Sequence, residues 1–332
     1  MRQCDLGVGG TIIAANIDYH LRPVRAGRDM PAILDLVEIG FQHELDPQGW
    51  KMLNQMRRIT QTGSVGQVIT NAGTDIAGFV CVADATVVGN LSLRRASHRT
   101  RRGCMIGNVV VHPDYRGQGM GRALMLKGIA AARRQDAEWV GLEVRANNTV
   151  ACTLYEHLGF RAVGTMQHML RPSGRPWPRS SQSESAWRVS KPRHSDHWRR
   201  LVKCLHPPDQ RLVLETATRA FRFGGLERRL NQWLSGQAER AWIYELTADR
   251  VPMAVRVQAD RRYKFHVWEL LMDPASTHAR TDEMVNQCLV GTRRFPTWSV
   301  IAMVPDHPAL LDSLHSVGFE LHRTLQQMVL KL

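Results

Sequence analysis

The sequence has little that suggests a membrane or secreted protein. Its six cysteines are scattered without a Cys-x-x-Cys pair, and no apolar run approaches the length of a membrane span. The first residues lack a charged segment followed by a long apolar one, so no secretory signal is expected. We therefore expect reduced thiols, a cytoplasmic protein and no membrane partner.

Other absences narrow the chemistry. Fourteen histidines are present, but no His-Glu-x-x-His and no His/Cys pair at zinc spacing occur, so no metal site is predicted. Gly-Lys-Ser/Thr is missing, and so is G-x-G-x-x-G with a following acidic residue, which argues against a P-loop and a dinucleotide fold. Positive charge is abundant, because 44 Lys+Arg against 30 Asp+Glu give a net charge of +14. This surplus suits phosphates, acidic substrates or nucleic acid without choosing between them.

The length of 332 residues suggests two domains. Residues 1–17 are interpreted as a leader, and the Pro-, Ser- and Arg-rich segment 171–187 as a linker between domains at 18–170 and 188–332. The charge of the linker could contact nucleic acid, but regularly spaced aromatic residues for base stacking are missing. No nucleic-acid partner is therefore expected.

The first unit alternates strand-like and helix-like segments. Asp29 is expected to be the N-cap of its first helix, with Pro31 in the permitted first turn. Gly159 is expected to end the last helix, and the basic segment 98–103 to be a loop. Strands are expected at 18–24, 66–70, 76–83, 86–95, 104–111, 139–146 and 160–170, turns at 71–73 and 84–86, and further helices at 46–61, from the glycine-rich segment to 135, and at 149–158.

The second half repeats the first. "LGFRAVGTMQHM" at 158–169 corresponds to "VGFELHRTLQQM" at 317–328, with a shared Gly-Phe, a Thr five residues later and a final Gln-x-Met. Residues 25–37 correspond to 193–205 and residues 109–114 to 269–275. Three matches in the same order, at offsets near 160, indicate duplication of one αβ unit.

The stretch "VVVHPDYRGQGMGRALM", residues 109–125, carries the most specific motif. A valine-rich strand ends at a His-Pro turn, and three glycines are followed at once by an apolar helical segment. A glycine-rich turn that opens a helix leaves N–H groups pointing outward, and the helix dipole adds partial positive charge. Such a turn binds an anion such as a pyrophosphate, although an ordinary surface turn is the alternative.

Two segments resemble one family. Arg116 to Gly121 fit the pattern Arg/Gln-x-x-Gly-x-Gly/Ala, which resembles the coenzyme A pyrophosphate loop of the Gcn5-related N-acetyltransferases (GNAT family). Asn148, Ala151 and Tyr155 fit the Asn-x-x-Ala-x-x-x-Tyr segment of that family. The order of strand, glycine loop, helix, strand, Asn, Tyr and Gly-Phe follows the family over roughly residues 18–170.

The resemblance implies an α/β (α+β) fold, here two tandem GNAT-like units, each a twisted mixed sheet flanked by helices. It implies acetyl transfer from acetyl-CoA to a primary amine by direct attack in a ternary complex.

Tyr155 would be the catalytic acid at the leaving sulfur, and Asn148 would meet the cofactor arm; a tyrosine that only caps the core is the alternative. The strand before the loop would end at a bulge and splay from its neighbour to admit the pantetheine. The acetyl-CoA contacts implied are Val109, Val110, Val111, Arg116, Gly117, Gln118, Gly119, Met120, Gly121, Arg122, Asn148 and Tyr155.

One departure from the family concerns the general base. Many relatives carry an acidic residue in the strand before the loop, where this sequence reads Met105-Ile106-Gly107-Asn108. Glu44, Asp46 and Glu143 are candidates, as are water and a substrate group, and nothing in the sequence prefers one. The missing carboxylate leaves open a non-catalytic acyl-CoA-binding regulatory module. A nucleic-acid-binding protein is a further alternative that rests on charge alone.

The second unit lacks the motif residues. "DPASTHARTDEMV" at 273–285 replaces the glycine loop, and Asp282 and Glu283 would repel a pyrophosphate. Leu314 stands where Tyr155 is expected and His307 where Asn148 is expected. We therefore expect a degenerate second domain that extends the sheet or walls the acceptor site, and one acetyl-CoA per chain. The acceptor cannot be identified, although the basic loops favour an acidic or carboxylate-bearing one.

Overall fold

The computed structural model describes residues 18–42, 45, 47–61, 77–98, 100–178, 186–214, 236–247, 249–275 and 280–332. The expected leader, the strand at 66–70 and the turn at 71–73 lie outside these ranges. None of the helices in the described ranges is long and apolar enough to cross a membrane.

The first half of the chain follows the expected order of elements. They are β1 (Tyr19–Pro23), α1 (Ala26–Phe41), α2 (Pro47–Gln61), β2 (Ala77–Ala83), β3 (Thr86–His98), β4 (Arg101–Val111), the short 3-10 helix η1 (Pro113–Tyr115), α4 (Met120–Arg134), β5 (Trp139–Arg145), α5 (Thr149–His157) and β6 (Arg161–Arg171). The turn at Asp84 and Ala85 has positive φ at both residues, which suits a tight hairpin. Gly159 follows α5 with φ of 90°, as a residue after a helix end requires.

The second half repeats this order, as the sequence repeat predicts. Its elements are β7 (Trp187–Val189), the 3-10 helix η2 (Pro192–His194), α6 (Ser195–Leu205), α7 (Pro208–Val213), β8 (Gln237–Tyr244), β9 (Met253–Asp260), β10 (Phe265–Met272), α9 (Thr281–Thr292), β11 (Ser299–Val304), α10 (Pro308–Ser316) and β12 (Glu320–Lys331). In each half a helix connects two parallel strands, β4 to β5 and β10 to β11.

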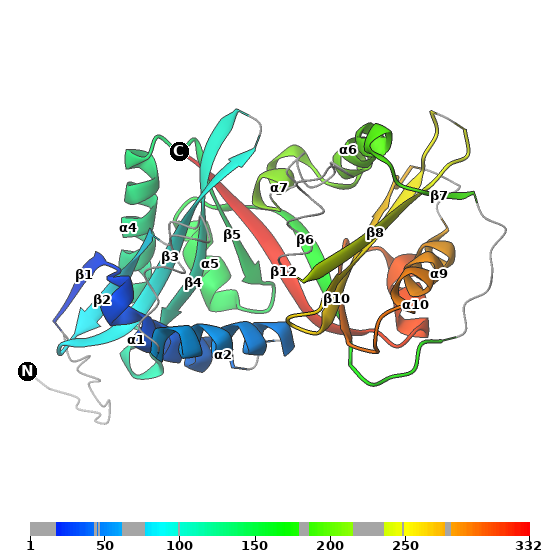
Figure 1. The fold of residues 1–332 in the computed structure, drawn as a ribbon. Helices are drawn as coiled ribbons and strands as arrows, with labels where there is room; N and C mark the ends of the chain where they lie inside the picture. Colours follow the sequence, from blue (N-terminus) through cyan, green and yellow to red (C-terminus); the bar gives the residue numbers. More distant parts are fainter. Residues whose placement is uncertain are drawn as a thin grey trace, which may run out of the picture.

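The twelve strands of the described residues form one sheet in the order β1-β2-β3-β4-β5-β12-β6-β11-β10-β9-β8-β7 (Figure 1). The last strand of each half is therefore exchanged: β12 pairs with β5, and β6 pairs with β11. Met328 of β12 packs in the core of the first half, and Met169 of β6 packs in the core of the second. The expected boundary between residues 170 and 188 thus separates the halves in sequence, while each core contains a strand from the other half.

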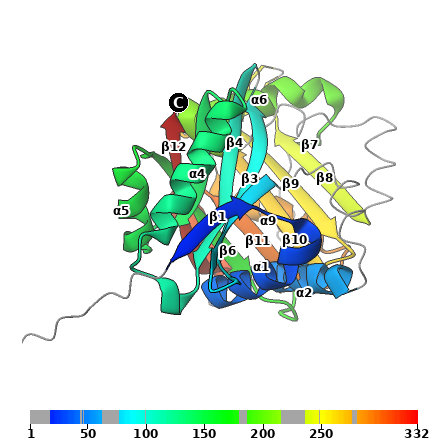
Figure 2. The ribbon, with the colours of Figure 1, turned by 90° about the vertical axis from the view of Figure 1, so that its left-hand side faces the viewer.

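Helices cover both faces of this sheet. Phe79 and Cys81 of β2 pack in the same core as α4 and α5, whereas Val80 and Val82 pack under α1 and α2. In Figure 2, α4 and α5 lie together on the left of the strands, and α1 and α2 lie apart from them at the bottom. In the second half, α9 and α10 share one core and α6 packs in another, on the opposite face.

The start of α1 differs from the expectation. The helix begins at Ala26, so Asp29 is not its N-cap, and Pro31 lies beyond the first turn. Asp29 is 1% exposed, binds Arg22 at 2.5 and 2.7 Å, and accepts the N–H of Arg25 at 2.7 Å. The carboxylate reaches back to an N–H before the helix, which lets the helix start earlier than the sequence indicates. The hydrogen bond and charge of Arg22 also lower the pKa of Asp29.

The segment 98–103 also differs, because most of it is strand. β3 continues to His98 and β4 begins at Arg101, so only residues 99 and 100 connect them. Pairing extends to His98 opposite Arg101, so β3 and β4 form one long hairpin within the first half of the sheet. The side chains of this segment are polar on both faces of the strands, so the sequence shows no alternation of apolar and polar residues there.

Candidate active site

A bulge interrupts β4 between Gly107 and Val110, shortly before the glycine loop. Ser92 pairs with Gly107, but Asn90 pairs with Val110, so β4 has an extra residue here. Asn108 has a positive φ of 49°, which asparagine tolerates better than most residues. The side chain of the buried Asn90 donates to the Asn108 carbonyl at 2.9 Å and fixes the distortion.

Beyond the bulge, β4 and β5 separate. They pair in parallel from Gly103 opposite Trp139 to Ile106 opposite Leu142, and no further. β5 continues to Arg145 on the β12 side. The expected splay between the two strands is therefore present, and it opens beside Val109.

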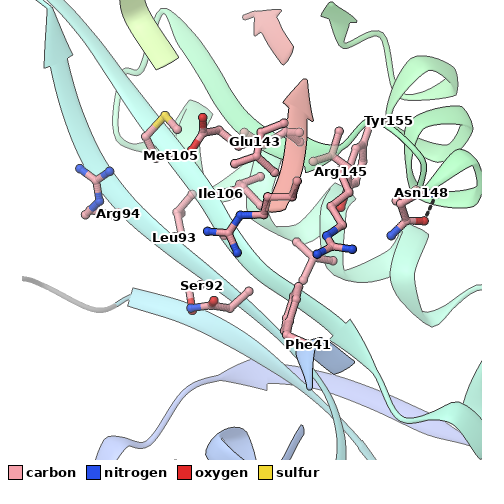
Figure 3. Close-up of a pocket in the computed structure, with 18 residues that line it drawn as sticks. Phe41, Ser92, Leu93, Arg94, Met105, Ile106, Glu143, Arg145, Asn148 and Tyr155 are labelled. Atoms are coloured by element: carbon pink, nitrogen blue, oxygen red, sulfur yellow. Dashed lines mark hydrogen bonds between the residues drawn. The ribbon is translucent and has the colours of Figure 1, made fainter. Parts of the chain in front are cut away.

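A cavity of about 560 Å³ fills this opening (Figure 3). Its walls come from both faces of the sheet and, through β12, from the second half of the chain. The lining residues are Phe41, Ser92, Leu93, Arg94, Met105, Ile106, Gly107, Asn108, Val109, Leu142, Glu143, Val144, Arg145, Asn148, Ala151, Tyr155, Arg323 and Leu325.

The glycine loop forms the N-terminus of α4. Gly117 and Gly119 have φ of 77° and 78°, and Gly119 is the N-cap residue. Within the described chain, the backbone N–H groups of residues 117–122 donate to no backbone carbonyl. A Cβ added at Gly119 would meet no atom within 4 Å, so the space beside the loop is open. These features are those of an anion site at a helix N-terminus.

Asn148 and Tyr155 come from α5. Asn148 caps this helix, since its side-chain oxygen accepts the N–H of Ala151 at 3.1 Å. Tyr155 is 7% exposed and packs near Phe160, with ring centroids 6.1 Å apart. Burial raises the pKa of Tyr155 to about 12, so its hydroxyl stays protonated at neutral pH and is available as a donor.

Among the three carboxylates named as base candidates, Glu143 lines the cavity. It alternates on β5 with Leu142 and Val144, which pack in the core under α4 and α5, so it faces the opposite side of the sheet. Glu44 and Asp46 lie outside the described residues. In Figure 3, Glu143 lies near Met105, apart from Tyr155, which lies beside the helix that carries Asn148.

A buried hydrogen-bond chain from the second half ends at Glu143. Gln327 donates to Glu143 at 2.8 Å and accepts from Gln210 of α7 at 3.1 Å. The Gln210 side-chain oxygen lies 3.3 Å from the ring nitrogen of His206. Gln327 is fully buried, so its amide has a fixed set of partners. This chain holds the Glu143 carboxylate in one position at the cavity wall.

The structure thus brings together some of the predicted residues and adds others. Val109, Asn148 and Tyr155 line the cavity, whereas the loop residues 116–122 lie at the α4 terminus outside its lining. Sequence reasoning missed Arg94, Arg145, Arg323 and Gln327 as site residues. Polar residues at alternate positions in the "LEVRA" segment were a usable signal for Arg145, but β12 reaches the site only by strand exchange.

The equivalent region of the second half is built differently. β10 pairs with β9 from Phe265 to Met272 without a register shift, so it has no bulge. Asp282 and Glu283 occupy the first turn of α9. His307 caps α10 through its ring nitrogen, as Asn148 caps α5, and Leu314 is buried at the position of Tyr155.

Comparisons with known proteins show which family this chain resembles. Residues 47–160 match the acetyltransferase (GNAT) family. The GCN5-related N-acetyltransferase from Sphaerobacter thermophilus shares the fold over 94% of this chain and 95% of its own, with a TM-score of 0.64 at 15% identity. A tandem GNAT protein from the clavulanic acid biosynthesis pathway aligns over 95% of this chain and 98% of its own, with a TM-score of 0.56 at 14% identity.

Two curated relatives match part of the chain. The [ribosomal protein bS18]-alanine N-acetyltransferase of Escherichia coli (strain K12) is 47% identical over 53 residues, which are 16% of this chain and 36% of that protein. Mycothiol acetyltransferase of Thermobispora bispora is 33% identical over 145 residues, 42% of this chain and 46% of that protein. The chain spans between a third and a half of the length of these relatives. The first half therefore resembles the GNAT family over residues 47–160, and the likeness to solved structures extends the tandem GNAT fold over both halves.

Proposed function

We propose that this chain is an acetyl-CoA-dependent N-acetyltransferase whose active site lies in the first half. The observation that carries the proposal is the bulged β4, which parts from β5 beside the open N-terminus of α4. The opening leads to a cavity that contains a buried phenol on one side of the sheet and a carboxylate on the other. One relative is named for a ribosomal protein and another for mycothiol, so the resemblance to the family leaves the acceptor open.

The residues present fit acetyl-CoA. The N–H groups of residues 117–122 would hold the pyrophosphate, together with Arg116 and Arg122. The backbone of Val109 to Val111, which β5 does not cover, would bind the pantetheine arm, and Asn148 lies at the mouth of the cavity. Acetyl-CoA would supply the activated acyl group to this site.

The chain's own residues would then manage the protons. Glu143 would accept a proton from the substrate ammonium, and the free amine would attack the thioester carbonyl carbon as the carbon–sulfur bond breaks. The nitrogen of the new amide would lose its second proton to the departing thiolate, which leaves as the CoA thiol. Tyr155 would donate a hydrogen bond to the departing sulfur. Because its pKa is about 12 and that of a thiol is about 8.5, complete proton transfer from Tyr155 is unfavourable. Its role is therefore to stabilise the developing thiolate, a narrower role than that of the catalytic acid expected from the sequence.

A substitution at Glu143 tests the reaction. With acetyl-CoA and an amine acceptor, release of the CoA thiol should be measurable, and Glu143→Gln should lower kcat by about 100-fold because general-base help is lost. Glu156→Gln, on the exposed side of α5, is the matched control and should leave turnover unchanged. Acetyl-CoA binding without thiol release by the wild type would instead support the regulatory-module alternative. An unchanged kcat in Glu143→Gln would show that Glu143 is not the general base.

A further inference from the structure

Most of the charged side chains that line the cavity are positive. They are three guanidinium groups, from Arg94, Arg145 and Arg323, and one carboxylate, from Glu143. The groups come from β3, β5 and β12, three strands that are distant in sequence. Even if Glu143 binds one of the arginines, the lining keeps a surplus of positive charge.

Strand alternation places this charge on one face of the sheet. Leu93 of β3 and Leu142 of β5 pack in the core with α4 and α5. Their neighbours Arg94, Glu143 and Arg145 therefore point to the opposite face, which α1, α2 and α7 cover. Figure 3 shows Arg94, Glu143 and Arg145 around the cavity, with Glu143 and Arg145 on the same strand.

The third arginine follows the same rule. Met328 of β12 packs in the core with α4 and α5, and Gln327 faces the other side, where it meets Glu143. Arg323 lies four residues before Gln327 on the same strand, so both point to the same face. It is half-buried, and its cross-strand neighbour is His168 of β6. The second half of the chain thus contributes a cation to a site in the first half.

We infer that the amine acceptor carries an anionic group, a carboxylate or a phosphate, and that Arg94, Arg145 and Arg323 bind it beside Glu143. This inference rests on the proposed function. The opposite face holds Tyr155 and the α4 terminus, so the cofactor enters there and the acceptor occupies the arginine side. Arginine suits both anions, because its planar guanidinium donates two parallel hydrogen bonds to their oxygens. Glu143 lines the same cavity and would face the ammonium of this acceptor, which gives the site complementary charges for both ends.

Matched acceptor pairs test the inference. The probes are β-alanine against β-alaninamide, and O-phosphoethanolamine against ethanolamine, each titrated by calorimetry into the full-length, CoA-bound protein and assayed with acetyl-CoA. An anionic amine should bind about 10-fold or more tightly than its neutral counterpart. The carboxylate and phosphate arms show separately which anion is preferred.

Arginine variants connect the preference to the cavity. Arg323→Gln and Arg94→Gln should each weaken the preferred anionic acceptor by about 10- to 100-fold, in Kd or KM, without changing the affinity for neutral amines. Arg95→Gln is the control: it removes the same charge from β3, but Arg95 points away from the cavity and its Nε donates to Gln135 at 3.0 Å. Circular dichroism melting would establish that each variant is folded.

Two results would overturn the inference. One is that no anionic amine binds more tightly than its neutral partner; the other is that the preference survives in both Arg323→Gln and Arg94→Gln. Acetylation of neutral and anionic amines with equal efficiency would support the proposed function but contradict the anionic acceptor. Arginine-dependent binding of an anionic amine without acetyl transfer would support the anionic ligand but contradict the proposed function.

Discussion

Tyr155 shows how burial changes the role of a single residue. Its position on α5 follows from a local motif, but its exposure of 7% and raised pKa come from packing against the core. With a pKa of about 12, the hydroxyl remains protonated through the whole range in which the enzyme would be assayed. In the proposed reaction it would therefore serve as a fixed hydrogen-bond donor to the departing sulfur.

Replacement of Tyr155 by Phe should lower kcat while acetyl-CoA affinity stays unchanged. A hydrogen bond to a developing charge contributes about 1.5–3 kcal/mol, so the expected loss is about 10- to 100-fold. The wild-type kcat should also show no decline near pH 10 that depends on Tyr155, because its pKa lies above that range. Steady-state kinetics from pH 7 to 10.5 would check both, and equal turnover in the two proteins would show that Tyr155 is only a core residue.

At the scale of elements, β12 is the strand that joins the halves. It pairs with β5 from Leu325 opposite Arg145 to Lys331 opposite Trp139, and with β6 on its other edge. Through this strand, Gln327 connects Glu143 to Gln210 of α7 and, beyond it, to His206 at the end of α6. The geometry of the proposed base therefore depends on a residue that lies 184 positions away in sequence.

Gln327→Leu should lower kcat by about 10-fold without changing the KM for acetyl-CoA, because Glu143 loses the donor that positions it. The variant also leaves the buried Gln210 amide without its acceptor, which should lower the free energy of unfolding by about 1–3 kcal/mol. Gln326→Leu is the control, since this neighbour faces α5 and lies 3.6 Å from the Cys152 sulfur. Equal kcat in Gln327→Leu and the wild type would show that the chain has no part in positioning Glu143.

Buried histidines at the junction of the halves make stability depend on pH. Burial and the charges of Arg323 and His322 lower the pKa of His168 to about 3, and burial also lowers the pKa of His206. The folded protein therefore binds fewer protons than the unfolded chain, whose histidines titrate near about 6.5, so stability falls as pH decreases from about 6.5 toward 3.

For His168 alone, the free energy of unfolding should fall by about 2 kcal/mol between pH 7.5 and pH 5. Urea unfolding at the two pH values would measure the change, and His168→Gln should reduce it. A free energy of unfolding that stays level from pH 7.5 to 5 would contradict the depressed pKa.

At the scale of the whole molecule, one fold is used twice with different contents. The first half has the bulge, the glycine loop and the phenol, whereas the second has a regular β10, two acidic residues at the start of α9 and a buried Leu314. We propose that only the first half binds acetyl-CoA. The second half would then complete the active site of the first half through β12, which supplies Arg323 to the cavity and Gln327 as the donor to Glu143.

Titration calorimetry should therefore give one acetyl-CoA per chain, and Gly121→Glu should abolish binding by placing a negative charge at the α4 N-terminus. A Cβ at Gly121 meets Leu154 at an ordinary 3.7 Å, so the effect is electrostatic rather than steric. Gly27→Glu is the control, because Gly27 occupies the equivalent second position of α1 and a Cβ there meets nothing within 4 Å. Two equivalent sites, or binding that persists in Gly121→Glu, would show that the second half also holds the cofactor.

The sequence by itself determined the features that depend on residues close together in the chain. The glycine loop before α4, the Asn148 cap, the position of Tyr155 and the order of most elements follow from turn chemistry, capping and periodicity within about ten residues. The start of α1 escaped prediction, because it depends on a carboxylate that reaches back to the N–H of Arg25.

Only the tertiary structure decided which last strand completes each half. β6 and β12 descend from the same repeated segment and share its Thr and Gln-x-Met pattern, so either strand carries the alternation needed to pair with β5 or with β11. Local sequence cannot choose between two partners that present the same pattern. The exchange brings Arg323 and Gln327 to the cavity, and it comes from packing both halves into one continuous sheet.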